Sequence, residues 1–162
     1  MPNFDRPIQG AANFTLKELI VSETASRKGL DNTPDSKTVA ALEYLAQKCL
    51  QPARDHFKRP IVITSGYRSP AVNAAVGGSA TSFHSFGCAA DVRIPGVPLW
   101  DLFAWFYGHV PFTELIAEEL PGGWIHIALQ KGRENERATK YKLINKSVQR
   151  ASFAEIKKIM GP

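Results

Sequence analysis

Residues 82–91 read Ser-Phe-His-Ser-Phe-Gly-Cys-Ala-Ala-Asp and carry two groups that can bind a metal. His84 offers an imidazole and Asp91 a carboxylate, and the residues between them are mostly small. A third candidate ligand, His126, lies far downstream in the apolar run Trp-Ile-His-Ile-Ala. Two histidines and one carboxylate leave one open position for water on a tetrahedral zinc ion, which is the arrangement a hydrolase needs. The sequence therefore predicts one Zn²⁺ ion held by His84, Asp91 and His126.

The length and composition indicate a single soluble domain over residues 1–162. A chain of 162 residues can bury a substantial core, and 44% hydrophobic with 22% charged residues is ordinary for a globular protein. No stretch approaches the roughly 20 apolar residues of a membrane span. The first residues contain no apolar signal core, and two cysteines do not make a disulfide framework. We therefore expect synthesis in the cytoplasm, no membrane insertion and a monomer.

Positive charge is concentrated toward the C-terminal end of the chain, whose net charge is +5. A basic surface suits an anionic polymer, such as nucleic acid, a membrane or a bacterial wall with acidic groups. The alternative is a solvated basic face without a partner, and charge alone does not choose between them. Residues 131–150 contain only two acidic residues, Glu134 and Glu136, beside Lys131, Arg133, Arg137, Lys140, Lys142, Lys146 and Arg150.

Capping signals and hydrophobic periodicity predict four helices. A capping box at Thr15–Glu18 opens a helix that ends near Gly29, and Thr33-Pro34-Asp35 opens a longer one. An apolar stripe continues that second helix to Ala53 and makes Cys49 a buried core residue. Pro98 begins a helix with an aromatic core-facing side, and Ser152 with Glu155 begins the last.

Short apolar runs predict the strands. They lie at 61–64, which we expect to be central, and at 89–94, 114–119, 124–129 and 141–144. Terminal helices combined with hairpin-linked strands favour an α+β fold with a mostly antiparallel central sheet flanked by helices.

The hairpin around Pro121-Gly-Gly123 nominates a proton carrier. A loop of three residues at 121–123 would place Glu118 directly across from His126 on the same face, with Cβ atoms about 5 Å apart. Glu119 would then pair with Ile125 and point to the opposite face. A loop of another length would change this register. Glu118 is therefore the candidate general base beside the metal.

Arg68 lies in the turn Ser65-Gly-Tyr-Arg-Ser-Pro70 at the end of a strand. It could polarise a scissile carbonyl, stabilise an oxyanion or bind a substrate carboxylate; a salt bridge that braces the turn is the alternative. Tyr67 and Ser82 are candidate substrate contacts, although a serine before a turn is commonly a local cap.

The remaining histidines and Cys88 are weaker candidates. His56 and His109 fit structural positions, and His109 is expected in a loop, where a substrate-facing role stays open. Cys88 is a possible soft ligand, but strand alternation toward Asp91 does not favour it.

The motif Ser82-x-His84-x-x-Gly87-x-Ala89-x-Asp91, followed by Trp124-x-His126, resembles that of the zinc D-Ala-D-Ala carboxypeptidase family. Within that family, the small single-domain branch found in phages and prophages is the most similar. The likeness covers roughly residues 13–132 and rests on further segments in the same order. They are Phe14-Thr-Leu, Asp31-Asn-Thr-Pro34, Ser65-Gly-Tyr-Arg-Ser-Pro70, Gly77-Gly-Ser and Leu115-Ile-Ala-Glu118.

The resemblance implies an α+β fold shared with the Hedgehog signalling domain. It also implies zinc on His84, Asp91 and His126, with Arg68 beside the reacting carbonyl. The implied substrates are peptidoglycan stem peptides, cut at D-Ala-D-Ala or, in endolysin relatives, at L-Ala-D-Glu. Dipeptidase members carry a catalytic glutamate three residues before the last histidine, where this chain has Gly123. The base must then come from elsewhere, and His109 is an alternative to Glu118 because some phage relatives use a second histidine.

The sequence thus predicts a zinc metallopeptidase that digests the bacterial cell wall, of the bacteriophage or prophage endolysin type. The absence of a signal core suits release through a membrane pore that another protein supplies. A zinc-stabilised binding module of the same fold without catalysis is the alternative. Nucleic-acid binding rests on charge alone and is not expected.

Overall fold

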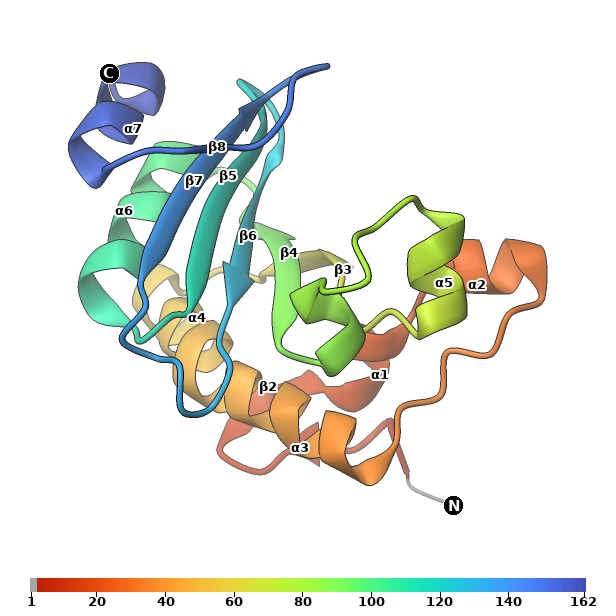
Figure 1. Ribbon diagram of the computed structural model, residues 1–162. Coiled ribbons are helices and arrows are strands. Elements are labelled where there is room, and N and C mark those ends of the chain that lie inside the picture. Colours follow the sequence, from red (N-terminus) through yellow and green to blue (C-terminus); the bar gives the residue numbers. More distant parts are fainter. Residues whose placement is uncertain (1–2) are drawn as a thin grey trace.

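The computed structural model describes residues 3–162 and shows an α+β fold around a six-stranded sheet (Figure 1). The strands follow the order β3-β4-β6-β5-β7-β8. All neighbouring strands are antiparallel except β5 and β7, which are parallel. The predicted α+β class and mostly antiparallel sheet are therefore confirmed. The six strands are β3 (Val62–Ser65), β4 (Ala89–Arg93), β5 (Glu114–Leu120), β6 (Trp124–Ala128), β7 (Ala138–Leu143) and β8 (Gln149–Arg150).

Helices and a small N-terminal ribbon surround this sheet. The ribbon pairs β1 (Pro7–Ile8) with β2 (Ala11–Thr15). Helices α3, η1 and α4 follow one another without a break from Ser36 to Phe57, and η1 is a π-helical turn. None of the described helices is long and apolar enough to cross a membrane. The helices are α1 (Leu16–Ile20), α2 (Glu23–Lys28), α3 (Ser36–Leu45), η1 (Ala46–Leu50), α4 (Gln51–Phe57), α5 (Pro70–Ala75), η2 (Phe83–Phe86), α6 (Leu99–His109) and α7 (Phe153–Met160).

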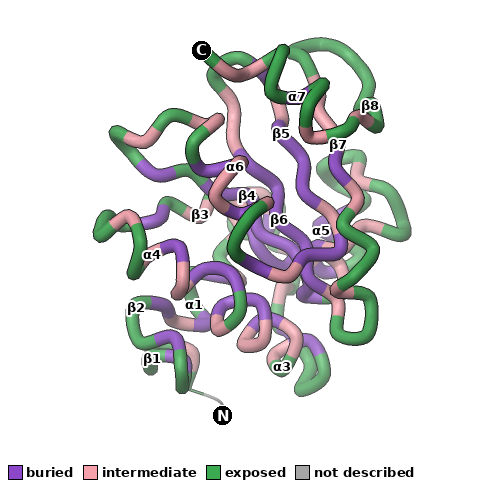
Figure 2. Tube along the Cα trace, turned by 90° about the vertical axis from the view of Figure 1, so that its left-hand side faces the viewer, coloured by how far each residue is buried: buried purple, intermediate pink, exposed green. Residues whose placement is uncertain are grey.

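Strand alternation gives the two faces of the sheet different roles. Successive side chains of a strand point to opposite faces. The core face carries apolar residues that are fully or almost fully buried and belong to one hydrophobic cluster with the aromatic residues of α6. Figure 2 shows the buried residues concentrated in β4, β5 and β6. The opposite face carries the polar residues of these same strands. The core-face residues are Ala90, Val92, Leu115, Ala117, Ile125 and Ile127.

Local sequence signals define most helix ends, with two corrections. The capping boxes at Thr15–Glu18 and Ser152–Glu155 are both present. The first helix ends at Ile20 rather than near Gly29, because Ser22 caps a separate helix, α2, that ends at Gly29.

The second predicted helix begins later than expected. Asp31 accepts a hydrogen bond from the Thr33 backbone at 2.9 Å, which forms a turn before the helix. Asp35 accepts one from Thr38 at 2.7 Å and is the N-cap, so α3 begins at Ser36 rather than after Thr33. An aspartate side chain can accept a backbone N–H in a turn, as Asp31 does, or at a helix N-cap, as Asp35 does. The residue type alone therefore does not locate the start of the helix.

The predicted central strand at 61–64 is an edge strand. β3 pairs only with β4 within the described sheet, and Val62 is 37% exposed. β-Branched residues favour a pleated and partly buried strand, and both edge and central strands meet that condition. The run therefore predicts a strand but not its place in the sheet.

The basic stretch at 131–150 is largely occupied by internal contacts. Lys140 pairs with Glu114 and Lys142 with Glu119. Arg133 pairs with Glu136 at 2.7 Å, and the Arg137 guanidinium lies 4.2 Å from the Phe112 ring centre. The stretch is therefore not a uniform basic face, as its composition alone would suggest.

Gly66 connects β3 to the turn that follows it and has backbone on one side. The backbone N–H of Tyr67 donates to the Leu19 carbonyl of α1 at 2.7 Å. A Cβ built on Gly66 would lie 2.1 Å from that same carbonyl oxygen. Only glycine therefore fits between β3 and α1.

We predict that Gly66→Ala lowers the free energy of unfolding by about 2–3 kcal/mol, because backbone must move to admit the methyl group. Gly108→Ala is the matched control, since a Cβ at Gly108 meets nothing within 4 Å. That variant should gain up to about 1 kcal/mol from helix propensity. Urea unfolding of both variants tests the packing, and an unchanged midpoint for Gly66→Ala would contradict it.

Candidate metal centre

Three side chains from separate elements converge on the polar face of the sheet. Asp91 on β4 and His126 on β6 are directly paired in register, so both side chains point to the same face. His84 comes from η2, the short helix that precedes β4. One ligand atom from each residue lies within 4.8 Å of the others, and all three residues are buried. The structure thus brings together the three predicted metal ligands.

His84 is held by a backbone carbonyl. Its Nδ1 lies 2.7 Å from the Gly66 carbonyl oxygen, so Nδ1 carries the proton in that hydrogen bond. Its Nε2 lies 3.2 Å from Oδ1 of Asp91. Burial lowers the pKa of His84, although Asp91 partly opposes this. A neutral His84 then directs a bare nitrogen at a carboxylate oxygen, and two acceptors at this distance need a cation or proton between them.

His126 lies between two carboxylates. Its Nδ1 is 3.0 Å from Oδ1 of Asp91. Its Nε2 is 3.3 Å from Oε1 of Glu114, although it is not aligned as a hydrogen bond. Burial by itself lowers the pKa of His126, but the hydrogen bond with Asp91 and the negative charges of Asp91 and Glu114 outweigh it and raise the pKa to about 9.

The spacing of the ligand atoms fits a small tetrahedral cation. Zinc–ligand distances of about 2.0–2.1 Å place neighbouring ligand atoms about 3.3 Å apart. The corresponding separations from Asp91 Oδ1 are 3.2 Å to His84 and 3.0 Å to His126. A second contact also holds each ring in place, as in metal sites where the other ring nitrogen is engaged. The residues present therefore fit a zinc ion, which would replace the proton shared with Asp91.

Arg68 supports the other oxygen of Asp91. Its Nη2 lies 3.3 Å from Oδ2, and its Nε donates to the Ser65 hydroxyl at 2.9 Å. Burial works to raise the pKa of Asp91, but its contacts with His126 and His84 outweigh it and hold the pKa well below its usual range. The salt bridge considered as the alternative role of Arg68 is thus present, and Arg68 also lines the groove beside the site.

The hairpin register differs from the predicted one by two residues. Ile116, not Glu118, lies across from His126, and Glu118 lies across from Trp124. The pairing of β5 with β6 ends at Glu118 and Trp124, so five residues rather than three connect the paired positions, and Glu119 among them has a φ of +52°. A shift of two residues keeps every side chain on its predicted face. Glu118 therefore still points toward the site, with Oε1 3.9 Å from His126 Nδ1.

The environments of Glu118 and Glu119 differ. Burial and the charge of Asp91 raise the pKa of the Glu118 carboxyl, which is the direction that suits an acid–base group. Glu119 was predicted to pair with Ile125 and point to the opposite face. Instead Ala117 pairs with Ile125, and Glu119 lines the groove and pairs with Lys142.

Glu114 is a site residue that the sequence analysis missed. Burial acts to raise the pKa of its carboxyl, but the nearby His126 and the ion pair with Lys140 outweigh this and lower it. Glu114 precedes Glu118 by four residues on the same strand, so alternation puts both on one face. That spacing was the available signal.

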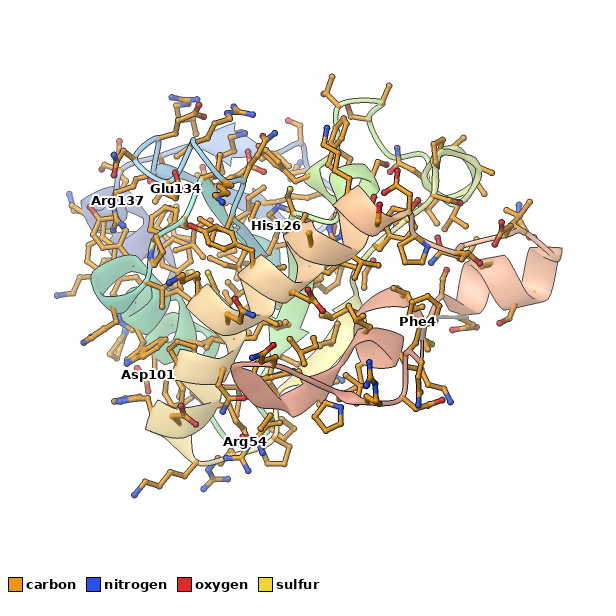
Figure 3. The ribbon with its side chains drawn as sticks, turned by 90° about the horizontal axis from the view of Figure 1, so that it is seen from below. Phe4, Arg54, Asp101, His126, Glu134 and Arg137 are labelled. Atoms are coloured by element: carbon orange, nitrogen blue, oxygen red, sulfur yellow. The ribbon has the colours of Figure 1, made fainter. Side chains whose placement is uncertain are left out.

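A groove of about 640 Å³ opens beside the cluster, within the range of ligand-binding sites. Arg68, Asp91, Arg93, Trp124 and Ile144 are among the residues that line it. Figure 3 shows His126 toward the middle of the molecule.

A family model described as Peptidase M15 matches residues 12–128, which include all three candidate ligands. The chain belongs to the peptidase M15 family. The resemblance to zinc D-Ala-D-Ala carboxypeptidases is thereby confirmed, and the chain is a peptidase by family. A search of curated proteins gives no match.

The M15 match ends at the last residue of β6. β7 therefore lies outside the matched segment, although Lys140 on β7 contacts Glu114 beside His126. The Gly123 departure has a steric reason. A Cβ at this position would lie 1.8 Å from the Glu118 carbonyl oxygen, so this turn does not admit a glutamate there.

The other candidate residues from the sequence lie outside the His84–Asp91–His126 cluster. His109 is the last residue of α6 rather than a loop residue, and it stacks on Trp105 with ring centres 5.1 Å apart. His56 stacks on the same indole. Ser82 caps η2 by accepting from the His84 backbone, and Tyr67 is buried beside a smaller hollow that adjoins Arg68.

The two cysteines are both buried and free. Cys49 is a core residue, as predicted, and burial raises its thiol pKa. Cys88 directs its sulfur to the Phe86 carbonyl and is not part of the ligand cluster.

We predict that His84→Ala or Asp91→Ala reduces zinc affinity by more than about 100-fold, because even outer contacts of a metal site are worth 10–100-fold. His109→Ala is the control and should bind zinc like the unmodified protein. Competition with a chromophoric chelator measures the affinity. Zinc retained at full affinity by the first two variants would exclude the ligand set, and zinc lost from His109→Ala would restore His109 as a candidate.

Proposed function

We propose that this M15 peptidase is a zinc metallopeptidase that hydrolyses peptide bonds of peptidoglycan stem peptides. The observation that carries the proposal is the buried His84–Asp91–His126 cluster, which lies beside a groove and next to Glu118 and Arg68. The family match supports the reaction class, since its members act on such peptides.

His84 Nε2, Asp91 Oδ1 and His126 Nδ1 would hold the zinc ion. When bound, zinc supplies Lewis acidity and lowers the pKa of a coordinated water to about 7. The surrounding contacts keep the ligands in position: Gly66 fixes the His84 ring, and Glu114 with Lys140 lies behind His126.

Glu118 takes the proton from the attacking water and delivers it to the leaving amine. Its carboxylate lies close enough to His126 to reach a water at the cluster and is 19% exposed, so it meets both the metal site and the substrate side. A positioned carboxylate of this kind contributes about 10²–10⁴-fold to the rate. Position 123, where dipeptidase members of the family carry the catalytic glutamate, is a glycine in this chain and supplies no carboxylate.

Arg68 stabilises the negative charge that develops on the scissile carbonyl oxygen. Its Nε and Nη2 are engaged by Ser65 and Asp91, which hold the guanidinium in one orientation. The Arg68 side chain is 20% exposed and lines the groove. A preorganised donor of this type stabilises a transition state without reorganising during the reaction.

The bond that is cut is D-Ala-D-Ala or L-Ala-D-Glu, the two alternatives predicted from the family motif. Action as a phage or prophage lysis enzyme remains a prediction, as do release through a pore and attachment of the basic C-terminal residues to the acidic wall.

We predict that Glu118→Gln and Arg68→Ala each slow the release of peptide fragments from purified peptidoglycan by about 10²–10⁴-fold. Both variants should keep their bound zinc. Glu43→Gln on α3 is the carboxylate control and should digest the wall at the normal rate. Mass spectrometry of the released fragments measures the rate and identifies the bond.

Two results would overturn the proposal. Undiminished digestion by both variants with zinc bound would remove Glu118 and Arg68 from the mechanism. Binding to peptidoglycan by the unmodified zinc-loaded protein without any fragment release would instead favour the non-catalytic binding module.

A further inference from the structure

Four cationic side chains lie around the groove and the polar face of the sheet, and three have acidic partners. Arg68 pairs with Asp91, Lys140 with Glu114, and Lys142 with Glu119. Arg93 is the fourth, and its side chain makes no hydrogen bond or ion pair with any residue in 3–162. It is exposed and lines the groove.

Arg93 stands at a fixed position relative to the metal cluster. It follows Asp91 by two residues on β4, so both side chains point to the same face about 7 Å apart along the strand. The register that pairs Asp91 with His126 and Val92 with Ile125 places Arg93 beside Trp124, which also lines the groove. Arg93 is thus the next side chain after Asp91 on the face of β4 that carries the metal cluster.

The groove also contains acidic groups, but they are already engaged. Asp91 accepts from His126 and Arg68 and lies 3.2 Å from His84 Nε2, and Glu119 pairs with Lys142. Among the charged side chains that line the groove, Arg93 is therefore the one without a partner within residues 3–162. Arginine binds carboxylates through two parallel N–H···O bonds, which suits capture of such a group from solution.

We propose that Arg93 binds a free carboxylate of the substrate next to the scissile bond. This inference rests on the proposed function, because it concerns the ligand of the same groove. Two carboxylates of stem peptides lie close to the bonds considered above: the terminal carboxylate of a chain ending in D-Ala-D-Ala, and the α-carboxylate of a γ-linked D-Glu. The first belongs to an exopeptidase and the second to an endopeptidase.

The test compares defined stem peptides that differ in one carboxylate. One pair carries a free or amidated C-terminus, and the other carries D-Glu or D-isoglutamine. We expect the unmodified enzyme to show at least a 10-fold higher KM for the amidated member of one pair only. Arg93→Gln should raise KM for the carboxylate form to that of the amide and change kcat little. Arg93→Lys should recover part of the discrimination.

Arg54→Gln is the control, since Arg54 lies on α4 near the rim of the molecule, away from His126 (Figure 3). It should keep normal discrimination. Urea unfolding of Arg93→Gln checks that the fold is retained. Equal losses by Arg93→Gln on both members of each pair, or no loss on any, would overturn the inference.

Binding separates this inference from the proposed function. The same peptide pairs are titrated calorimetrically into zinc-loaded Glu118→Gln protein, with and without Arg93→Gln. If the enzyme cuts no peptide but Arg93→Gln weakens binding of one carboxylate form alone, the proposed function fails and the carboxylate site stands. If peptides are cut but neither carboxylate affects KM or binding, the proposed function stands and the carboxylate site fails.

Discussion

The buried carboxylate of Asp91 determines how the site is assembled. A charged carboxylate taken out of water without partners would destabilise the fold by several kcal/mol. Asp91 is 5% exposed, and His84, His126 and Arg68 approach its two oxygens from η2, β6 and the turn after β3. Each of these three segments must be in place for the charge to be compensated. The fold and the ligand cluster therefore depend on the same contacts, and a cation bound there would satisfy the same requirement.

Much of this site could be predicted because its chemistry is carried by residue type and strand alternation. His84 and Asp91 are close in sequence, and His126 lies in a strand whose polar face is evident from its apolar neighbours. The face of Glu118 survived an error of two residues in the hairpin register, since side chains alternate with a period of two. An error of one residue would have turned Glu118 into the core.

Other features depend on contacts between distant segments that composition does not reveal. The run at 61–64 has the residues of a strand, but its place at the edge follows from which strands pair with it. Glu114 is on the same face as Glu118 by alternation, but its contacts with His126 and Lys140 follow from the pairing of β5 with β6 and β7. The basic stretch looked like one charged surface, whereas its side chains divide between ion pairs, aromatic contacts and solvent. Arg93 could not be predicted as a site residue either, because its lack of an acidic partner is visible only once the partners of the neighbouring cations are known.

The Gly66 peptide has a consequence for the entropy of ligand binding. Its carbonyl fixes the rotamer and the tautomer of His84, and its missing side chain lets α1 lie against it. The side-chain freedom of this imidazole is thus lost when the chain folds, before any cation arrives. Cation binding then costs little side-chain entropy at His84, so less of the favourable interaction free energy is lost and the affinity is higher. Loosening α1, which lies on the other side of this one peptide, would return that disorder to the ring and weaken the affinity without altering a single ligand.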